Sequence, residues 1–197
     1  MTSPADGAEP EPDGLADLDE LAATAPDLHD DAVALRPPPV ADVEAITAAC
    51  QDPEIQRWTT VPSPYGPDDA RGFVDLCRLA WREALAAPFL IVRADDPTVV
   101  LGAIDLRHTG PVTAEVGYWV APQARRQGVA RRAMVLLCDW AFARLDKHVL
   151  TLQVYDGNDA SVAVAEGADF HHAGEIVAEH RGAEQPAHLY ARLAPGC

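Results

Sequence analysis

One segment of this 197-residue chain limits its fold more than any other: a strand-like run at residues 114–120 leads through a turn into an amphipathic helix pattern. The turn reads Arg-Arg-Gln-Gly-Val-Ala at residues 125–130. The first N–H groups of a helix lack partners within it and lie at the positive end of the helix dipole. Gly128 lets a ligand approach the backbone, and the arginines add positive charge. The segment predicts a phosphate site, with an exposed Arg-rich loop as the alternative.

The rest of the sequence alternates helix and strand patterns in a mixed order. Apolar residues recur at helical spacing after Asp42, after Asp68, through the segment just described, and after Asn158. Residues 54–67 are too irregular for a strand and too aromatic for a plain linker, which predicts a folded loop. Strands are predicted at residues 34–36, 89–92, 99–106, 114–120, 149–155, 174–178 and 188–193. This order favours one α/β (α+β) domain over residues 32–197.

The beginning of the chain is strongly acidic. Residues 1–31 contain ten Asp or Glu residues and no Lys or Arg, the first basic residue being Arg36. Such a segment, also rich in Pro, Gly and Ala, buries too little apolar surface to offset its ordering entropy. We therefore expect residues 1–31 to be a disordered tail whose deletion leaves the fold intact. A short helix near Leu15 is the alternative.

Charge and composition exclude several classes of function. A net charge of −16 repels nucleic acid and attracts cations, so we expect an amine partner and no nucleic acid. The N-terminus lacks a signal-peptide pattern and no apolar run is long enough for a bilayer, which predicts a cytoplasmic protein without a membrane partner. The cysteines lack metal-ligand spacing, so we expect reduced thiols and no metal: Cys50, Cys77, Cys138 and Cys197.

Several motifs in order resemble the GNAT superfamily of acyl-CoA-dependent N-acyltransferases. Its phosphate-binding motif reads Gln or Arg, two residues, Gly, one residue, then Gly or Ala, and Arg125, Gly128 and Ala130 match it. Gly-Tyr-Trp-Val-Ala-Pro at residues 117–122 precedes the motif, and Gly-Asn-Asp-Ala-Ser at 157–161 follows a further strand. With matching stretches upstream near residues 35–38 and 54–58, the chain resembles the RimJ/RimL-like branch of ribosomal-protein N-terminal acetyltransferases.

The resemblance implies a GNAT fold: a mixed, mostly antiparallel central sheet of about seven strands, splayed in the middle and flanked by about four helices. It implies acetyl-CoA as co-substrate, with the pantetheine arm between the strands at 114–120 and 149–155. The main-chain N–H near Tyr118 would polarise the thioester carbonyl, and Val120 would bond a pantetheine amide. The phosphates would bind Arg125, Arg126, Gln127, Gly128, Val129, Ala130 and Arg131.

Two further residues are implied at the start of the last helix, and some family features are missing. Asn158 would cap the helix and bond the pantetheine arm, and Ser161 would donate a proton to the leaving coenzyme A sulfur. Many members carry a Tyr where this chain has Ala165, and a Glu where it has Gln153. After this helix, Asp169 replaces the Gly that is usual in the family, and Asp tolerates the left-handed conformation.

The catalytic base is the least defined part of the prediction. Glu115 and His108 lie on adjacent predicted strands and are candidates that would face one pocket. A surface ion pair and a solvated strand end are the alternatives, and a water chain to solvent would serve instead of either. Trp58, Tyr65 and Trp119 are predicted to line the acceptor pocket, although large aromatics more often belong to a core.

Three functions stay open on the sequence. The first is an acetyl-CoA-dependent N-acetyltransferase that moves an acetyl group to a peptide N-terminus or a small amine by direct attack in a ternary complex. The second is a catalytically inactive GNAT module that only binds acyl-CoA. The third uses a larger acyl group such as succinyl. The sequence also leaves open whether the protein forms a homodimer.

Overall fold

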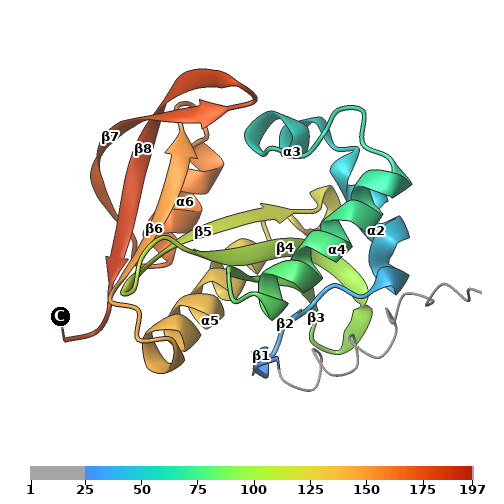
Figure 1. Cartoon of the computed structure of the whole chain (residues 1–197), viewed down its shortest axis with the longest axis horizontal. Helices are drawn as coiled ribbons and strands as arrows, with labels where there is room; N and C mark the ends of the chain where they lie inside the picture. Colours follow the sequence, from blue (N-terminus) through green and yellow to red (C-terminus); the bar gives the residue numbers. More distant parts are fainter. Residues whose placement is uncertain (1–24, 197) are drawn as a thin grey trace, which may run out of the picture.

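The computed structural model describes residues 25–196, which form an eight-stranded sheet with helices on both faces (Figure 1). The strands lie in the order β1-β2-β3-β4-β5-β6-β8-β7. They are β1 (Leu28–His29), β2 (Val33–Arg36), β3 (Ala86–Arg93), β4 (Asp96–His108), β5 (Thr113–Val120), β6 (Val149–Tyr155), β7 (His171–His180) and β8 (Ala183–Leu193). The helices are α2 (Val43–Cys50), α3 (Pro53–Trp58), α4 (Pro67–Arg82), α5 (Val129–Arg144) and α6 (Asp159–Gly167).

This architecture confirms the predicted α/β class and the mostly antiparallel sheet, with one more strand and one more helix than expected. Of the strand pairs in the described part of the chain, only β5 and β6 run parallel. The helix α5 connects these two strands, as a parallel pair requires. None of the helices between residues 25 and 196 combines the length and the apolar content that a membrane crossing needs.

The parallel pair separates along its length. β5 and β6 pair over only three residue couples, from Thr113–Val149 to Glu115–Thr151. β4 stays paired with β5 as far as Val120, and β8 stays paired with β6 as far as Tyr155. Each strand is therefore held by its outer neighbour while the two run apart, as Figure 1 shows. Beyond Glu115, no strand of residues 25–196 pairs with the β6 side of β5.

Each face of the sheet has its own core. On one face, α5 buries Ala133, Leu137 and Ala141 completely against the strands. On the other face, α2 and α4 bury Ile46 and Val74. Because side chains alternate along a strand, the even-numbered residues of β5 point toward α5 and the odd-numbered ones toward the α2–α4 side.

Residues 28–31 correct the predicted tail, whose first 24 residues lie outside the described part of the chain. β1 pairs with β2, and Leu28 packs against the α5-side core. The Asp30 carboxylate accepts the N–H groups of residues 32 and 33, each at 2.8 Å. Arg132 of α5 donates to Asp30 at 2.7 Å and to Asp31 at 2.6 Å. An apolar contact and a basic partner on α5 therefore order the last part of this acidic segment.

The start of the predicted loop at 54–67 is instead the helix α3. Asp52 is its N-cap and accepts the N–H groups of Glu54 and Ile55, while Pro53 occupies the first position of the helix. Both features are ordinary helix-start signals. The helix has only six residues, which is too short for a recognisable apolar period.

The tip of the β7–β8 hairpin holds α3 against the rest of the molecule. Arg181 donates to the carbonyl groups of Gln56 and Val61, each at 2.6 Å. His180 Nε2 lies 2.9 Å from the carbonyl oxygen of Arg57. These contacts join two segments that are more than a hundred residues apart in the sequence. They place α3 near the end of β6, on the side where β5 and β6 separate (Figure 1).

Candidate active site

The segment between β5 and α5 turns in the left-handed region before the helix begins. Arg126 has a φ of 62°, and Gly128, the N-cap of α5, has a φ of 77°. Arg132 donates its N–H to the Gly128 carbonyl at 3.0 Å, so the N–H groups of residues 129–131 precede the helical hydrogen-bond ladder. No heavy atom lies within 4 Å of the place that a Cβ at Gly128 would take. The backbone of this turn is therefore open at the Cα of Gly128.

Arg125 does not direct its guanidinium to this anion position. It forms an ion pair with Asp52, the N-cap of α3, and its Nε donates to the Val120 carbonyl at 3.2 Å. The prediction that the Arg125 side chain adds positive charge for the phosphates is therefore corrected, because the Asp52 carboxylate neutralises its guanidinium. The side chain instead links the phosphate segment to α3.

The neighbouring side chains are also engaged within the protein. The Gln127 amide donates to the Gln123 carbonyl at 2.8 Å, and Arg131 Nε donates to the Gly167 carbonyl at 2.6 Å. The latter contact ties the first turn of α5 to the end of α6. Of the predicted phosphate-binding residues, Arg125, Gln127 and Arg131 therefore have side chains that already bond within the protein.

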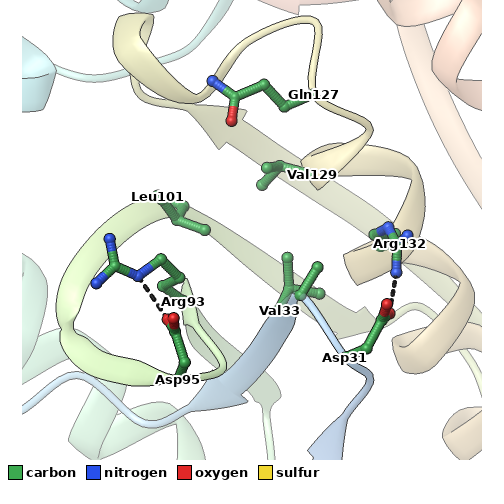
Figure 2. A pocket seen from close by; sticks show the side chains of 9 residues that line it. Asp31, Val33, Arg93, Asp95, Leu101, Gln127, Val129 and Arg132 are labelled. Atoms are coloured by element: carbon green, nitrogen blue, oxygen red, sulfur yellow. Dashed lines mark hydrogen bonds and ion pairs between the residues drawn. The ribbon is translucent and has the colours of Figure 1, made fainter.

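A cavity of about 280 Å³ lies beside the first turn of α5 (Figure 2). Its charges are paired across its rim: Arg93 with Asp95, and Arg132 with Asp31. An anionic ligand would have to displace these carboxylates. The residues that line the cavity are Asp31, Ala32, Val33, Arg93, Asp95, Leu101, Gln127, Val129 and Arg132.

The unpartnered edge of β5 presents backbone groups to the gap beside β6. Ala121 donates its N–H to Leu101 of β4 at 2.9 Å, so the peptide groups of Tyr118 and Val120 point the opposite way because directions alternate along a strand. The Val120 carbonyl, which accepts from Arg125, agrees with this direction. The Tyr118 N–H therefore faces the gap, and its role toward a thioester remains a prediction.

Two hydroxyl groups meet across this gap. Tyr118 Oη donates to Ser161 Oγ at 3.0 Å, and Ser161 is only 8% exposed. The Asn158 side chain caps α6 by accepting the Ser161 N–H at 3.2 Å, as predicted. Ala165, at the position where many relatives carry a tyrosine, is fully buried. The side chain of Tyr118, which sequence reasoning considered only for its main chain, therefore brings a phenol to Ser161.

A polar cluster occupies the opposite face of the sheet, near the same strands. Glu115 accepts from Arg107 at 2.6 Å and from Gln153 at 2.7 Å, one bond to each carboxylate oxygen. Asp105 lies beside Arg107 at 3.6 Å. Sequence reasoning missed Asp105 and Arg107, although their alternate positions on a strand that neighbours Glu115 are the signal that would have found them.

The structure separates the two predicted candidates for the base. His108 shares a strand with Asp105 but differs from it by an odd number of residues, so it points to the α5 side of the sheet, whereas Glu115 points to the other side. Burial and the charge of Lys147 lower the pKa of His108. The prediction that both residues face one pocket is wrong because the register puts them on opposite faces.

The three aromatic residues that were predicted to line the acceptor pocket lie in different places. Trp58 of α3 comes within 4.0 Å of the place that a Cβ at Gly157 would take, next to the start of α6. Tyr65 and Trp119 are only 6% and 9% exposed and belong to the core between α2 and α4. The prediction that these two residues line an acceptor pocket is therefore corrected: both are core residues, which was the alternative. Trp58 alone remains beside the gap.

The cysteines of the described chain are free and buried, as predicted for three of the four; Cys197 lies outside it. Burial raises the pKa of Cys50 to about 11 and that of Cys77 and Cys138 to about 12. Thiols with such pKa values hold their protons at neutral pH and are poor nucleophiles. Within residues 25–196, no group of three or more His, Cys, Asp or Glu side chains is arranged to hold a metal ion.

The fold thus combines a central parallel pair that separates after three residue couples with a helix, α5, that begins after β5. The sequence matches the family described as acetyltransferase (GNAT) domain over residues 33–171. The chain therefore belongs to the GNAT acetyltransferase family, as its motifs predict.

Solved structures share this fold. RimL, a ribosomal L7/L12 alpha-N-protein acetyltransferase in complex with coenzyme A, is 21% identical over 85% of this chain and 97% of its own, with a TM-score of 0.75. Ribosomal-protein-S5-alanine acetyltransferase of Vibrio fischeri is 17% identical over 87% and 98%, with a TM-score of 0.74. Mycobacterium smegmatis RimJ in complex with CoA-disulfide is 22% identical over 82% of each chain, with a TM-score of 0.73. No curated protein sequence matches the chain.

Proposed function

We propose that this protein is an acetyl-CoA-dependent N-acetyltransferase that acts on a primary amine through a ternary complex. The observation that carries the proposal is the unpartnered edge of β5, whose peptide groups face the gap beside β6 and lead into the free amides of α5. A pantetheine arm is an extended chain with amide groups, so it fits an edge that lacks a strand partner. Its pyrophosphate would then reach the amides of residues 126–131.

The reaction proposed for this arrangement needs no covalent enzyme intermediate. The amine lone pair attacks the thioester carbon, the Tyr118 N–H stabilises the oxyanion, and the C–S bond breaks. The thiolate takes a proton from the Ser161 hydroxyl, and the amine releases its proton to a base. That proton then returns through solvent to the Ser161 oxygen, which restores the enzyme. One oriented donor to an oxyanion supplies roughly 3 kcal/mol, and positioning of two substrates supplies more. The protonated cysteines offer no competing route.

The acceptor is proposed to be cationic before it reacts. The net charge of −16 attracts an ammonium group, and Glu115 and Asp105 lie on the sheet face near the gap. RimL and the Vibrio fischeri enzyme are named for the ribosomal proteins that they acetylate, which favours a peptide N-terminus over a small amine. Trp58 of α3 would border the entry of such a peptide. A second copy of the chain is the remaining proposed partner.

A module that binds acyl-CoA without turnover is the second candidate, and one observation favours it. Ala165 and Gln153 replace the usual acid and base, and Ala165 is fully buried without a hydroxyl group. Ser161 must then serve as the acid. A larger acyl group, such as succinyl, is the third candidate, decided by the space beside Tyr118.

The test separates binding from turnover. Calorimetry measures acetyl-CoA and succinyl-CoA binding, and a thiol reagent measures coenzyme A release with Ser- and Ala-initiated peptides and with spermidine. We expect acetyl-CoA binding and amine-dependent release. Binding without release for every amine would establish the inactive module, and preference for succinyl-CoA would change the acyl group. Absence of any acyl-CoA binding would refute all three candidates.

A further inference from the structure

Asp105 occupies a position that only a facing glycine allows. Asp105 on β4 lies opposite Gly117 on β5 in the register of the two strands. A Cβ at Gly117 would stand 2.6 Å from Asp105 Oδ1 and 3.0 Å from Arg107 Nη2. Both distances are shorter than van der Waals contact, so a side chain at residue 117 would push the carboxylate away. The carboxyl group of Asp105 thus reaches from β4 toward β5 and lies over the backbone of Gly117.

This position lies next to the proposed reaction centre. Gly117 immediately precedes Tyr118, whose N–H is the proposed donor to the thioester carbonyl. The Asp105 side chain lies on the sheet face opposite α5 and α6, as Glu115 and Gly117 do, whereas the Tyr118–Ser161 pair lies on the α6 side. An amine that approaches from the Asp105 side would have the acid Ser161 across the sheet from it. The base and the acid would then act on opposite sides of the thioester.

The bonding of the two carboxylates distinguishes their roles. Glu115 uses one oxygen for Arg107 at 2.6 Å and the other for Gln153 at 2.7 Å. Asp105 has Arg107 only at 3.6 Å, beyond hydrogen-bond distance. A carboxylate with both oxygens bonded is a weaker base, since a proton would have to replace a bond to a guanidinium or an amide. Asp105 keeps more of its basicity.

The surroundings of Asp105 also favour a proton acceptor. Burial, the largest effect, raises the pKa of Asp105. The charge of Glu115 adds to this shift, while Arg107 and the backbone N–H groups of Gly117 and of Asp105 itself oppose it. Cys77 of α4 faces the carboxyl group as well, and its thiol stays protonated. The Asp105 side chain is nevertheless 27% exposed, so a substrate ammonium can reach it. A carboxylate with a raised pKa accepts a proton more readily near neutral pH.

We propose that Asp105 is the general base of this enzyme, and that Glu115 is a positioning residue that holds Arg107 and Gln153. This inference rests on the proposed function. The acceptor ammonium transfers one proton to Asp105, which leaves its nitrogen with a lone pair that forms the C–N bond. As the C–S bond then breaks, the same nitrogen gives up a second proton, which replaces through solvent the proton that Ser161 passes to the thiolate. Asp105 releases the proton to solvent when the products leave. Nothing is oxidised or reduced.

The decisive experiment compares Asp105→Asn with Glu115→Gln in the full-length protein. With an amine that the wild type acetylates, Asp105→Asn should lower kcat by on the order of a hundredfold and remove the acidic limb of the pH–rate profile. Acetyl-CoA affinity by calorimetry and the thermal midpoint should stay near wild-type values. Glu115→Gln should keep the acidic limb with a smaller loss of rate. Asp146→Asn, at a carboxylate that is 92% exposed, is the surface control and should behave as wild type.

A second variant tests the geometry without touching the carboxylate. Gly117→Ala should displace Asp105 and lower kcat while acetyl-CoA still binds, since a Cβ there meets Oδ1. An Asp105→Asn variant that keeps both rate and acidic limb would overturn the inference, as would loss of that limb in Glu115→Gln alone. A wild type that binds acetyl-CoA but acetylates no amine would instead remove the proposed function, and the base with it.

Discussion

Single residues stand at the two ends of the proposed coenzyme A path. Gly128 has a φ of 77° and free space above it, a combination that suits close approach of an anion to the backbone. At the other end, Tyr118 contributes twice. Its N–H faces the gap, and its phenol donates to Ser161. In the proposed complex, main-chain groups would serve the phosphates and two hydroxyl groups would serve the sulfur.

The first prediction tests the phosphate position with a matched pair. Asn and Asp both tolerate the left-handed conformation, so Gly128→Asn and Gly128→Asp should fold alike and differ mainly in charge. We expect Gly128→Asp to weaken coenzyme A binding more than tenfold, because the carboxylate would lie among phosphate oxygens. Gly128→Asn should lose much less. Equal affinities in calorimetry would contradict a phosphate site at this turn.

The second prediction concerns the phenol of Tyr118. Tyr118→Phe keeps the main-chain donor and removes the 3.0 Å bond to Ser161. The loss of one neutral hydrogen bond is worth about 1 kcal/mol, so kcat should fall roughly fivefold at unchanged KM for acetyl-CoA. Because the phenol would act through Ser161, a Tyr118→Phe/Ser161→Ala double variant should be no slower than Ser161→Ala alone. Independent, additive losses in steady-state kinetics would show that the two hydroxyls do not cooperate.

At the scale of elements, α3 joins the segment before α5 to the side proposed for the acceptor. Asp52 caps α3 and pairs with Arg125, whose side chain also bonds Val120. The β7–β8 hairpin holds the other end of the helix through Arg181. A six-residue helix has little stability of its own, so these contacts determine where it lies and where Trp58 points.

The third prediction removes the cap of α3. Asp52→Ala should lower the free energy of unfolding by about 1 kcal/mol, since the cap loses its bonds to two helix amides. Although burial acts to raise it, Arg125 and these amides hold the pKa of Asp52 below its usual range. The carboxylate therefore stabilises the fold above about pH 4 and loses this effect as pH falls through its folded-state pKa. The stability difference between wild type and Asp52→Ala should shrink at pH 3 in thermal unfolding; a constant difference would exclude the ionic contribution.

At the scale of the whole molecule, the acidic beginning of the chain is part of the domain from residue 28. β1 adds an edge strand to β2, and Asp30 and Asp31 both pair with Arg132. This corner also borders the cavity of Figure 2, to which Asp31 and Arg132 contribute side chains. The first turn of α5 is therefore held from both sides: by β1 and the Asp30 turn on one side and by α6 on the other.

The fourth prediction compares two truncations. Deletion of residues 1–31 removes β1 and both partners of Arg132, so the thermal midpoint should fall by several degrees. Deletion of residues 1–24 leaves every contact described for residues 25–196 in place and is the matched control. Arg132→Ala should reproduce part of the larger loss. Equal midpoints for the two truncations would show that β1 contributes no stability.

Local sequence patterns determine much of this protein without any long-range contact. The strand at residues 149–155 is observed with its predicted bounds, Asn158 caps α6, and Asp169 takes the left-handed conformation with a φ of 61°. Each depends on neighbours within a few residues, as does the turn at Gly128. The short helix α3 escaped prediction although its Asp-Pro start was readable, because six residues carry no period.

The tertiary structure alone decided which side chains meet. Arg125 pairs with Asp52, which lies 73 residues away, rather than with a phosphate. Tyr118 meets Ser161 across a gap that opens only because β5 and β6 stop pairing after Glu115. His108 and Glu115 fall on opposite faces because the strand register, not the sequence distance, assigns the faces. Asp105 lies over Gly117 for the same reason. Register and strand separation arise from the packing of the whole sheet, so no local sequence pattern contains them.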